Sequence, residues 1–106
     1  MTDDELDLVF GALADRTRRA ILAELRRNPA NVAGLTELFD MSQPAVSKHL
    51  KVLENAGLVS RTRQGTMRLS HLEPGPLKDA TSWLADYREY WDESYKRLDE
   101  LLDRMD

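Results

Sequence analysis

The chain has 106 residues, of which 42% are hydrophobic and 32% charged, and its net charge is −4. This composition is typical of one soluble globular domain, here residues 1–106, and the absence of cysteine excludes disulfides, thiol chemistry and cysteine-ligated metals. No apolar run is long enough to span a membrane, and the acidic start MTDDELD does not resemble a secretory signal. We therefore expect a cytoplasmic protein without a membrane partner.

The charges are segregated along the chain. Residues 1–11 carry −4, residues 12–72 carry +5 and residues 73–106 carry −5. A basic centre between acidic ends can present one positive face to a polyanion although the total is negative. The alternative interpretation is a scatter of solvated charges, and charge alone does not decide between the two.

The first half of the chain predicts four short helices. Apolar residues recur at helical spacing in this part of the sequence. Asp15 and Ser42 are favourable N-caps for the second and fourth helices, Pro44 suits a first helical turn, and Gly57 suits the left-handed residue after a helix. We expect these helices at about residues 4–13, 16–27, 34–39 and 43–56.

The periodicity changes after Gly57. Residues 58–63 and 66–72 are expected to form two short strands, and Gln64-Gly65 between them suits a tight hairpin turn. The predicted hairpin is basic, so it can contact a polyanion such as the phosphate backbone of a nucleic acid. Its arginines are Arg61, Arg63 and Arg68. We refer to residues 58–72 as the wing.

The remaining residues predict one long helix over about 76–105. Apolar residues recur along it in alternating steps of three and four for about four heptads. Such a helix is about 45 Å long, which is more than so small a core can cover. We therefore expect it to form a homodimer interface together with the first helix, the alternative being a helix packed wholly on its own domain. The expected interface residues are Leu77, Leu84, Tyr87, Trp91, Leu98 and Leu101.

Residues 34–56 have the arrangement of a helix-turn-helix, whose second helix can lie in the major groove of double-stranded DNA. Val46, Leu50 and Leu53 share one face of that helix and are expected to hold it against the core. The other face then carries side chains that can pair with base edges or phosphates. These are Gln43, Ser47, Lys48 and Lys51.

The segment SQPAVSKHLKVLENAGLV (42–59), preceded by LADRTRRAIL (13–22), resembles the ArsR family of bacterial winged-helix regulators. The resemblance covers about residues 6–75. It implies a mainly α fold with a small β-hairpin, a winged helix-turn-helix that forms a homodimer through its long C-terminal and N-terminal helices. It also implies binding to inverted repeats in promoters, usually as a repressor. By position it implies DNA contacts for Gln43, Pro44, Ser47 and Lys48, with His49 beside them.

Three features depart from the common pattern of that family. Asp40 stands where a glycine usually makes the turn, although aspartate tolerates left-handed backbone. Gly34 opens the third helix, where a better helix former is usual. The family's metal sites use cysteine pairs on the third helix or histidines on the last helix, and this chain has neither there. We therefore expect no cofactor and no sensing of metals or thiol oxidants, and the chain resembles members that lack the metal sites.

Three other functions compete with DNA binding as interpretations of this sequence. An enzyme is disfavoured because only His49 and His71 are available as bases, Ser47 and His49 lie on different helix faces, and the glycines are scattered. A winged helix that binds a protein would favour aromatic anchors over the polar set on the fourth helix. The aromatic side chains of the last helix could instead bind a small-molecule effector, but filling a dimer interface is the favoured interpretation.

Overall fold

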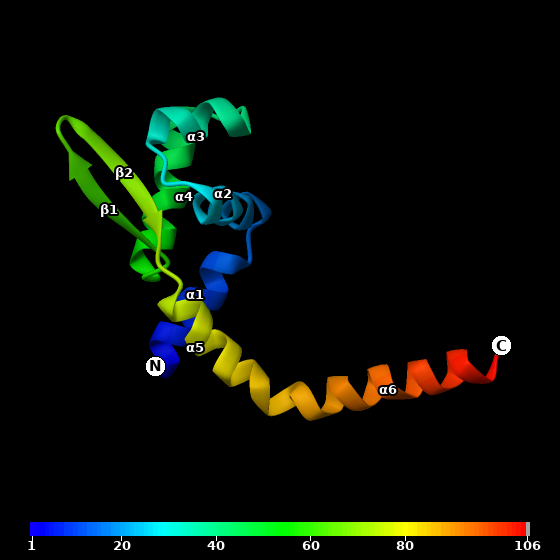
Figure 1. Cartoon of the computed structure of the whole chain (residues 1–106). Coiled ribbons are helices and arrows are strands. Elements are labelled where there is room, and N and C mark those ends of the chain that lie inside the picture. Colours follow the sequence, from blue (N-terminus) through cyan, green and yellow to red (C-terminus); the bar gives the residue numbers. More distant parts are fainter. Residues whose placement is uncertain (106) are drawn as a thin grey trace.

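In the computed structural model, which describes residues 1–105, a helical body carries a two-stranded hairpin and a projecting C-terminal arm (Figure 1). Asp106, the last residue of the predicted domain, lies outside the described residues. Within the described part, no helix combines the length and apolar character needed to cross a membrane. The elements are α1 (Asp3–Leu13), α2 (Arg16–Arg27), α3 (Val32–Phe39), α4 (Gln43–Asn55), β1 (Val59–Gln64), β2 (Met67–Leu72), α5 (Gly75–Leu84), the 3₁₀ turn η1 (Ala85–Tyr87) and α6 (Arg88–Arg104).

Side-chain caps explain where the first four helices begin. Thr2 forms a capping box at α1, Asp15 accepts hydrogen bonds from two backbone N–H groups of α2, and Ser42 accepts one at α4. The start predicted for α3 was wrong. Asn31 is the N-cap, and its Oδ1 accepts a hydrogen bond from the Gly34 N–H at 2.8 Å, so the helix begins two residues earlier than Gly34.

Two turns depend on residues that tolerate left-handed backbone. Asp40, between α3 and α4, has φ of 48°, as its place in the predicted helix-turn-helix required. The hairpin turn lies one residue later than predicted. Gln64 pairs with Met67 in the antiparallel ladder, so the loop is Gly65-Thr66 rather than Gln64-Gly65. Gly65 is the first residue of this loop, and its φ of 61° is the positive value for which a two-residue turn of type II′ needs a glycine at that position.

The core lies between the first four helices and the base of the hairpin. Val46, Leu50 and Leu53 are fully buried, which confirms that this face holds α4 against the body. Ile21 from α2 and Leu35 from α3 are also fully buried and belong to the same cluster. The body therefore holds α4 in place from several sides.

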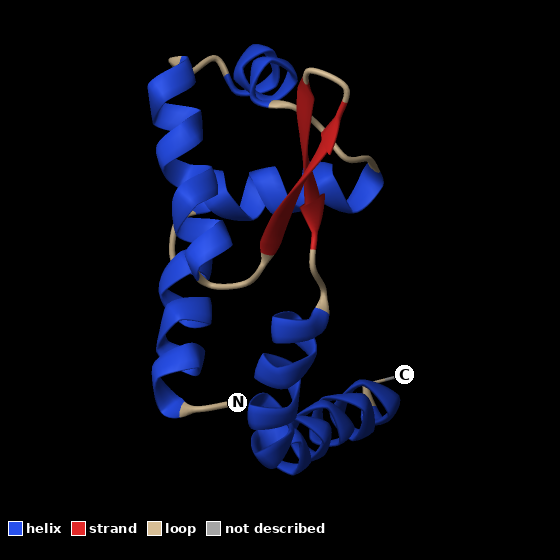
Figure 2. Ribbon diagram, turned by 90° about the vertical axis from the view of Figure 1, so that its left-hand side faces the viewer, coloured by secondary structure: helices blue, strands red, loops and turns tan. Residues whose placement is uncertain are grey.

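The C-terminal segment is not the one long helix predicted over about 76–105. It is divided into α5, η1 and α6, and Figure 1 shows the chain changing direction between them. The division falls where packing on the body ends: Ala80 is buried and Trp83 packs edge-on against Phe10 of α1 at 5.7 Å, whereas α6 has no buried residue. Short 3₁₀ segments are common connectors at helix ends. Figure 2 shows α5 below the hairpin and α6 leading away from the body.

Candidate nucleic-acid interface

The N-terminal half of α4 presents polar and basic side chains to solvent. Gln43, Pro44 and Lys48 are exposed, as is Lys51 one turn further on, whereas Ser47 is half-buried. The buried face of the same helix keeps these side chains in a fixed orientation. The structure thus brings this predicted set together on one surface.

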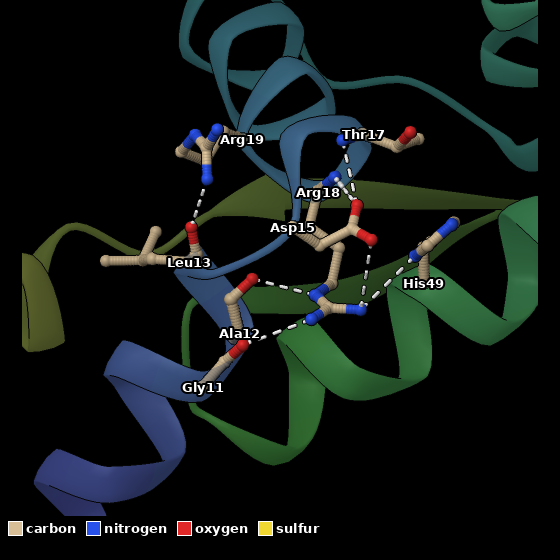
Figure 3. Close-up of polar contacts among 8 residues, drawn as sticks. All are labelled: Gly11, Ala12, Leu13, Asp15, Thr17, Arg18, Arg19 and His49. Atoms are coloured by element: carbon tan, nitrogen blue, oxygen red, sulfur yellow. Dashed lines mark hydrogen bonds and ion pairs between the residues drawn. The ribbon is translucent and has the colours of Figure 1, made fainter.

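His49 has a different environment from the other predicted contacts on α4. Its ring is half-buried and points towards α2, where its Nδ1 lies 3.5 Å from Nη1 of Arg18 (Figure 3). The resemblance suggested only that His49 accompanies the DNA-reading residues. The structure gives it a partner inside the protein, and a direct contact of His49 with DNA stays a prediction.

The arginines of the wing lie close together on the hairpin. Arg63 and Arg68 are exposed and directly opposite each other in the ladder, and Arg61 lies two residues before Arg63 on the same strand face. The three arginines, with Thr62, line a shallow hollow of about 230 Å³. Because like charges placed opposite each other destabilise a strand pair, this arrangement favours a polyanionic partner.

One ion pair connects the wing to the body, and one side-chain contact joins the two strands of the wing. Arg61 forms an ion pair with Glu54 of α4, so its charge is partly compensated inside the protein. The hydroxyl of Thr62 lies 2.5 Å from Nε2 of His71 on the opposite strand. Glu54 is a residue that sequence reasoning missed, and only its position near the end of α4, before a basic hairpin, hinted at this pairing.

A second group that sequence reasoning missed lies where α1 meets α2. Asp15 Oδ1 accepts hydrogen bonds from the N–H groups of Thr17 and Arg18, at 2.8 and 3.1 Å. The N–H of Arg18 lowers the pKa of Asp15 from its ordinary value of 3.8, aided by the N–H of Thr17 and the Arg18 charge and opposed by desolvation. The N-cap pattern in the sequence signalled the role of Asp15 but not the contacts of the Arg18 side chain.

The expected dimer residues differ in exposure. Leu77 packs partly against the core, whereas Leu84, Tyr87 and Trp91 are 50–56% exposed. Leu98 and Leu101 on α6 are exposed to a similar degree. In this part of the chain, most members of a stripe of large apolar side chains thus leave about half of their surface uncovered by the protomer itself. Trp83, Tyr90, Tyr95, Leu102 and Met105 widen the stripe.

In the part of the chain that the structure describes, no three His, Cys, Asp or Glu side chains lie close enough to hold a metal ion. His49 and His71 belong to separate groups, one against α2 and one within the hairpin. The surface described above is that of a helix-turn-helix with a basic wing, which defines a class of DNA-binding regulators.

Comparison with known proteins agrees with this class. The sequence profile of the arsR family of bacterial regulatory proteins matches residues 15–61. The transcriptional regulator Rv2034 of Mycobacterium tuberculosis is 38% identical over 97 residues, covering 92% of this chain and 88% of that protein. The transcriptional repressor SdpR of Bacillus subtilis is 33% identical over 79 residues, covering 74% of this chain and 88% of that protein. The crystal structure of an ArsR family transcriptional regulator, RHA00566, has a TM-score of 0.77 and 39% identity, covering 87% of this chain and 95% of that one.

The chain therefore belongs to the ArsR family of bacterial transcriptional regulators. Its fold is the winged helix-turn-helix of that family, mainly helical with one small hairpin, as predicted. The family consists of DNA-binding regulators and not of enzymes, which removes the enzyme from the functions considered.

Proposed function

We propose that this protein is a homodimeric repressor that binds an inverted-repeat operator in the cytoplasm. The observation that carries the proposal is the exposed polar face of α4, held in place by Val46, Leu50 and Leu53 and flanked by a wing with three arginines. A rigid helix with this surface fits the major groove, and arginines fit the phosphate backbone. The repressor role is supported by the relative SdpR, which is a transcriptional repressor.

The side chains of α4 and of the wing have different tasks in this proposal. Glutamine pairs with adenine through two hydrogen bonds, serine bonds a base edge or a phosphate, and lysine reaches guanine or a phosphate. The wing arginines neutralise phosphates and add affinity that does not depend on sequence. The proposed DNA-contacting residues are Gln43, Pro44, Ser47, Lys48, His49, Lys51, Arg61, Arg63 and Arg68.

The homodimer is proposed from the uncovered apolar stripe of the C-terminal arm. An exposed stripe of tryptophan, tyrosine and leucine is unfavourable in water and is typical of a surface covered by another chain. The stripe continues from α5, which packs against α1, so both helices adjoin the proposed interface. The proposed interface residues are Leu77, Leu84, Tyr87, Trp91, Leu98 and Leu101.

The proposal is tested by DNA binding of the purified protein. The probe is a duplex from the region upstream of the protein's own gene, first narrowed by footprinting, and the control is a shuffled duplex of equal composition. At physiological salt, we expect protection of two inverted half-sites about one helical turn apart, ~34 Å between centres. Equal affinity for the upstream and the shuffled duplexes would refute sequence-specific binding.

A further inference from the structure

The guanidinium group of Arg18 lies where three helices meet (Figure 3). Its Nε donates to the carbonyl oxygen of Ala12 at 2.7 Å and its Nη2 to that of Gly11 at 3.0 Å, both near the C-terminal end of α1. Its Nη1 lies 3.5 Å from Nδ1 of His49 on α4 and 4.0 Å from Oδ2 of Asp15, the N-cap of α2. The side chain is 18% exposed, so most of it is shielded from water.

The shape of the guanidinium group explains why an arginine suits this place. A carbonyl oxygen can accept two hydrogen bonds, and the last carbonyl groups of a helix are short of partners within it. The Gly11 oxygen also accepts a hydrogen bond from the Ala14 N–H at 3.2 Å, and the last turn of α1 has no basic residue of its own. A planar group with five N–H donors can bond two of these carbonyl oxygens with one edge and still direct Nη1 at α4. The ammonium of a lysine has no comparable fork, so it cannot hold the same three directions at once.

His49 connects this group to the DNA-reading surface. Its half-buried ring faces Arg18 on the body, whereas the neighbouring Lys48 is exposed (Figure 3). Because Arg18 has only donors, the ring nitrogen it contacts must accept, and the neutral ring then carries its proton on Nε2. A fixed ring resists rotation of α4 about its own axis, and such a rotation would move Ser47 and Lys48.

We propose that Arg18 is a positioning residue for DNA recognition, which holds α4 in its reading orientation by binding His49 while anchored to the end of α1. This inference rests on the proposed DNA-binding function and adds to it. Arg18 itself does not need to touch DNA.

The test compares Arg18→Gln and Arg18→Lys with the matched control Arg19→Gln. Arg19 is the neighbouring residue and donates to the carbonyl oxygen of Leu13 at the same end of α1, at 2.7 Å, but it points away from His49 (Figure 3). Arg19→Gln removes the same charge from the same helix without touching α4. For each variant, affinity is measured for the footprinted upstream duplex and for the shuffled duplex, alongside urea unfolding and sedimentation.

We expect both Arg18 variants to lose about tenfold in preference for the upstream duplex, the scale of one lost hydrogen bond to a charged group. Arg19→Gln is expected to keep the wild-type preference. His49→Gln is expected to lower the preference less when it is added to Arg18→Gln than when it is made in the wild type, because the contact between the two side chains is already lost. If the Arg18 variants keep the preference of Arg19→Gln, or if the losses at positions 18 and 49 multiply, the inference is wrong.

A second readout uses the free protein. Ring nitrogen shifts in NMR spectra are expected to show the Nε2–H form of His49 in the wild type and a mixture of forms in Arg18→Lys, which keeps the charge. Unchanged ring nitrogen shifts of His49 in Arg18→Lys would overturn the inference. A loss of DNA affinity that is fully explained by the loss of stability measured in urea would overturn it as well. If the wild type fails to distinguish the two duplexes, the proposed function fails, while the ring signals still decide whether Arg18 holds His49.

Discussion

Replacement of Trp91 by alanine is expected to dissociate the homodimer. In the single chain, 56% of the surface of Trp91 is exposed. A whole tryptophan presents roughly 250 Å², so about 140 Å² of it is available to a partner. Complete burial of that area at ~25 cal/mol per Å² stabilises the dimer by about 3.5 kcal/mol per protomer. Alanine retains part of the contact, so the expected loss is about 2–3 kcal/mol per side chain and about 4–6 kcal/mol per symmetric dimer.

The assay is sedimentation equilibrium over a range of protein concentrations. A loss of that size raises the Kd of the dimer by about three to four orders of magnitude. Lys96→Ala is the matched control, because Lys96 is exposed among charged side chains on another face of the same helix, and its dimer is expected to match the wild type. A wild-type protein that is monomeric at micromolar concentration would refute the reasoning, and so would a Trp91→Ala dimer of unchanged Kd.

The other predictions concern DNA, pH and metals. Ser47→Ala is expected to weaken binding to the footprinted duplex by about 1–3 kcal/mol and to relax the base preference at one position per half-site, measured with base-substituted duplexes; Gln43→Ala should act alike at another position. Arg63→Ala is expected to weaken binding to all DNA sequences equally and to reduce the slope of log affinity against log salt concentration by about one. An unchanged slope would contradict a contact of Arg63 with phosphate. Because folding lowers the pKa of Asp15, its ionised carboxylate stabilises the folded state at pH values above its ordinary pKa of 3.8. This contribution is lost as the pH falls through the lowered pKa. Asp15→Asn is therefore expected to unfold at a lower urea concentration than the wild type at neutral pH, and the difference between their midpoints is expected to shrink in acid. A difference that does not change with pH would argue against a stabilising role of the Asp15 carboxylate. Zinc, cobalt, nickel and peroxide are each expected to leave the protein–DNA complex intact, and stoichiometric release of DNA by any of them would show that the protein senses it.

Local signals were sufficient to predict the helix-turn-helix from the sequence. The positions of Asp15, Ser42 and Gly57 predicted where α2 and α4 begin and where α4 ends, because caps act within a few residues of the helix end. The helical spacing of Val46 and Leu50 predicted the buried face of α4 for the same reason. Once that face was known, the outward position of Lys48 followed from helix geometry alone.

Other features depended on contacts that have no local pattern. The bend at residues 85–87 lies where α5 leaves α1, and a heptad repeat continues through it without any sign of a break. The pairing of Arg61 with Glu54 depends on how the hairpin leaves α4.

Arg18 and His49 are 31 residues apart, and their contact depends on the packing of three helices at one point. Helical spacing predicts which face of each helix is buried, but it does not determine how two helices are placed relative to each other. The sequence therefore determined which surface of α4 is free to meet DNA. The tertiary structure decided what holds that surface in place, because that support comes from side chains and carbonyl groups brought together only by folding.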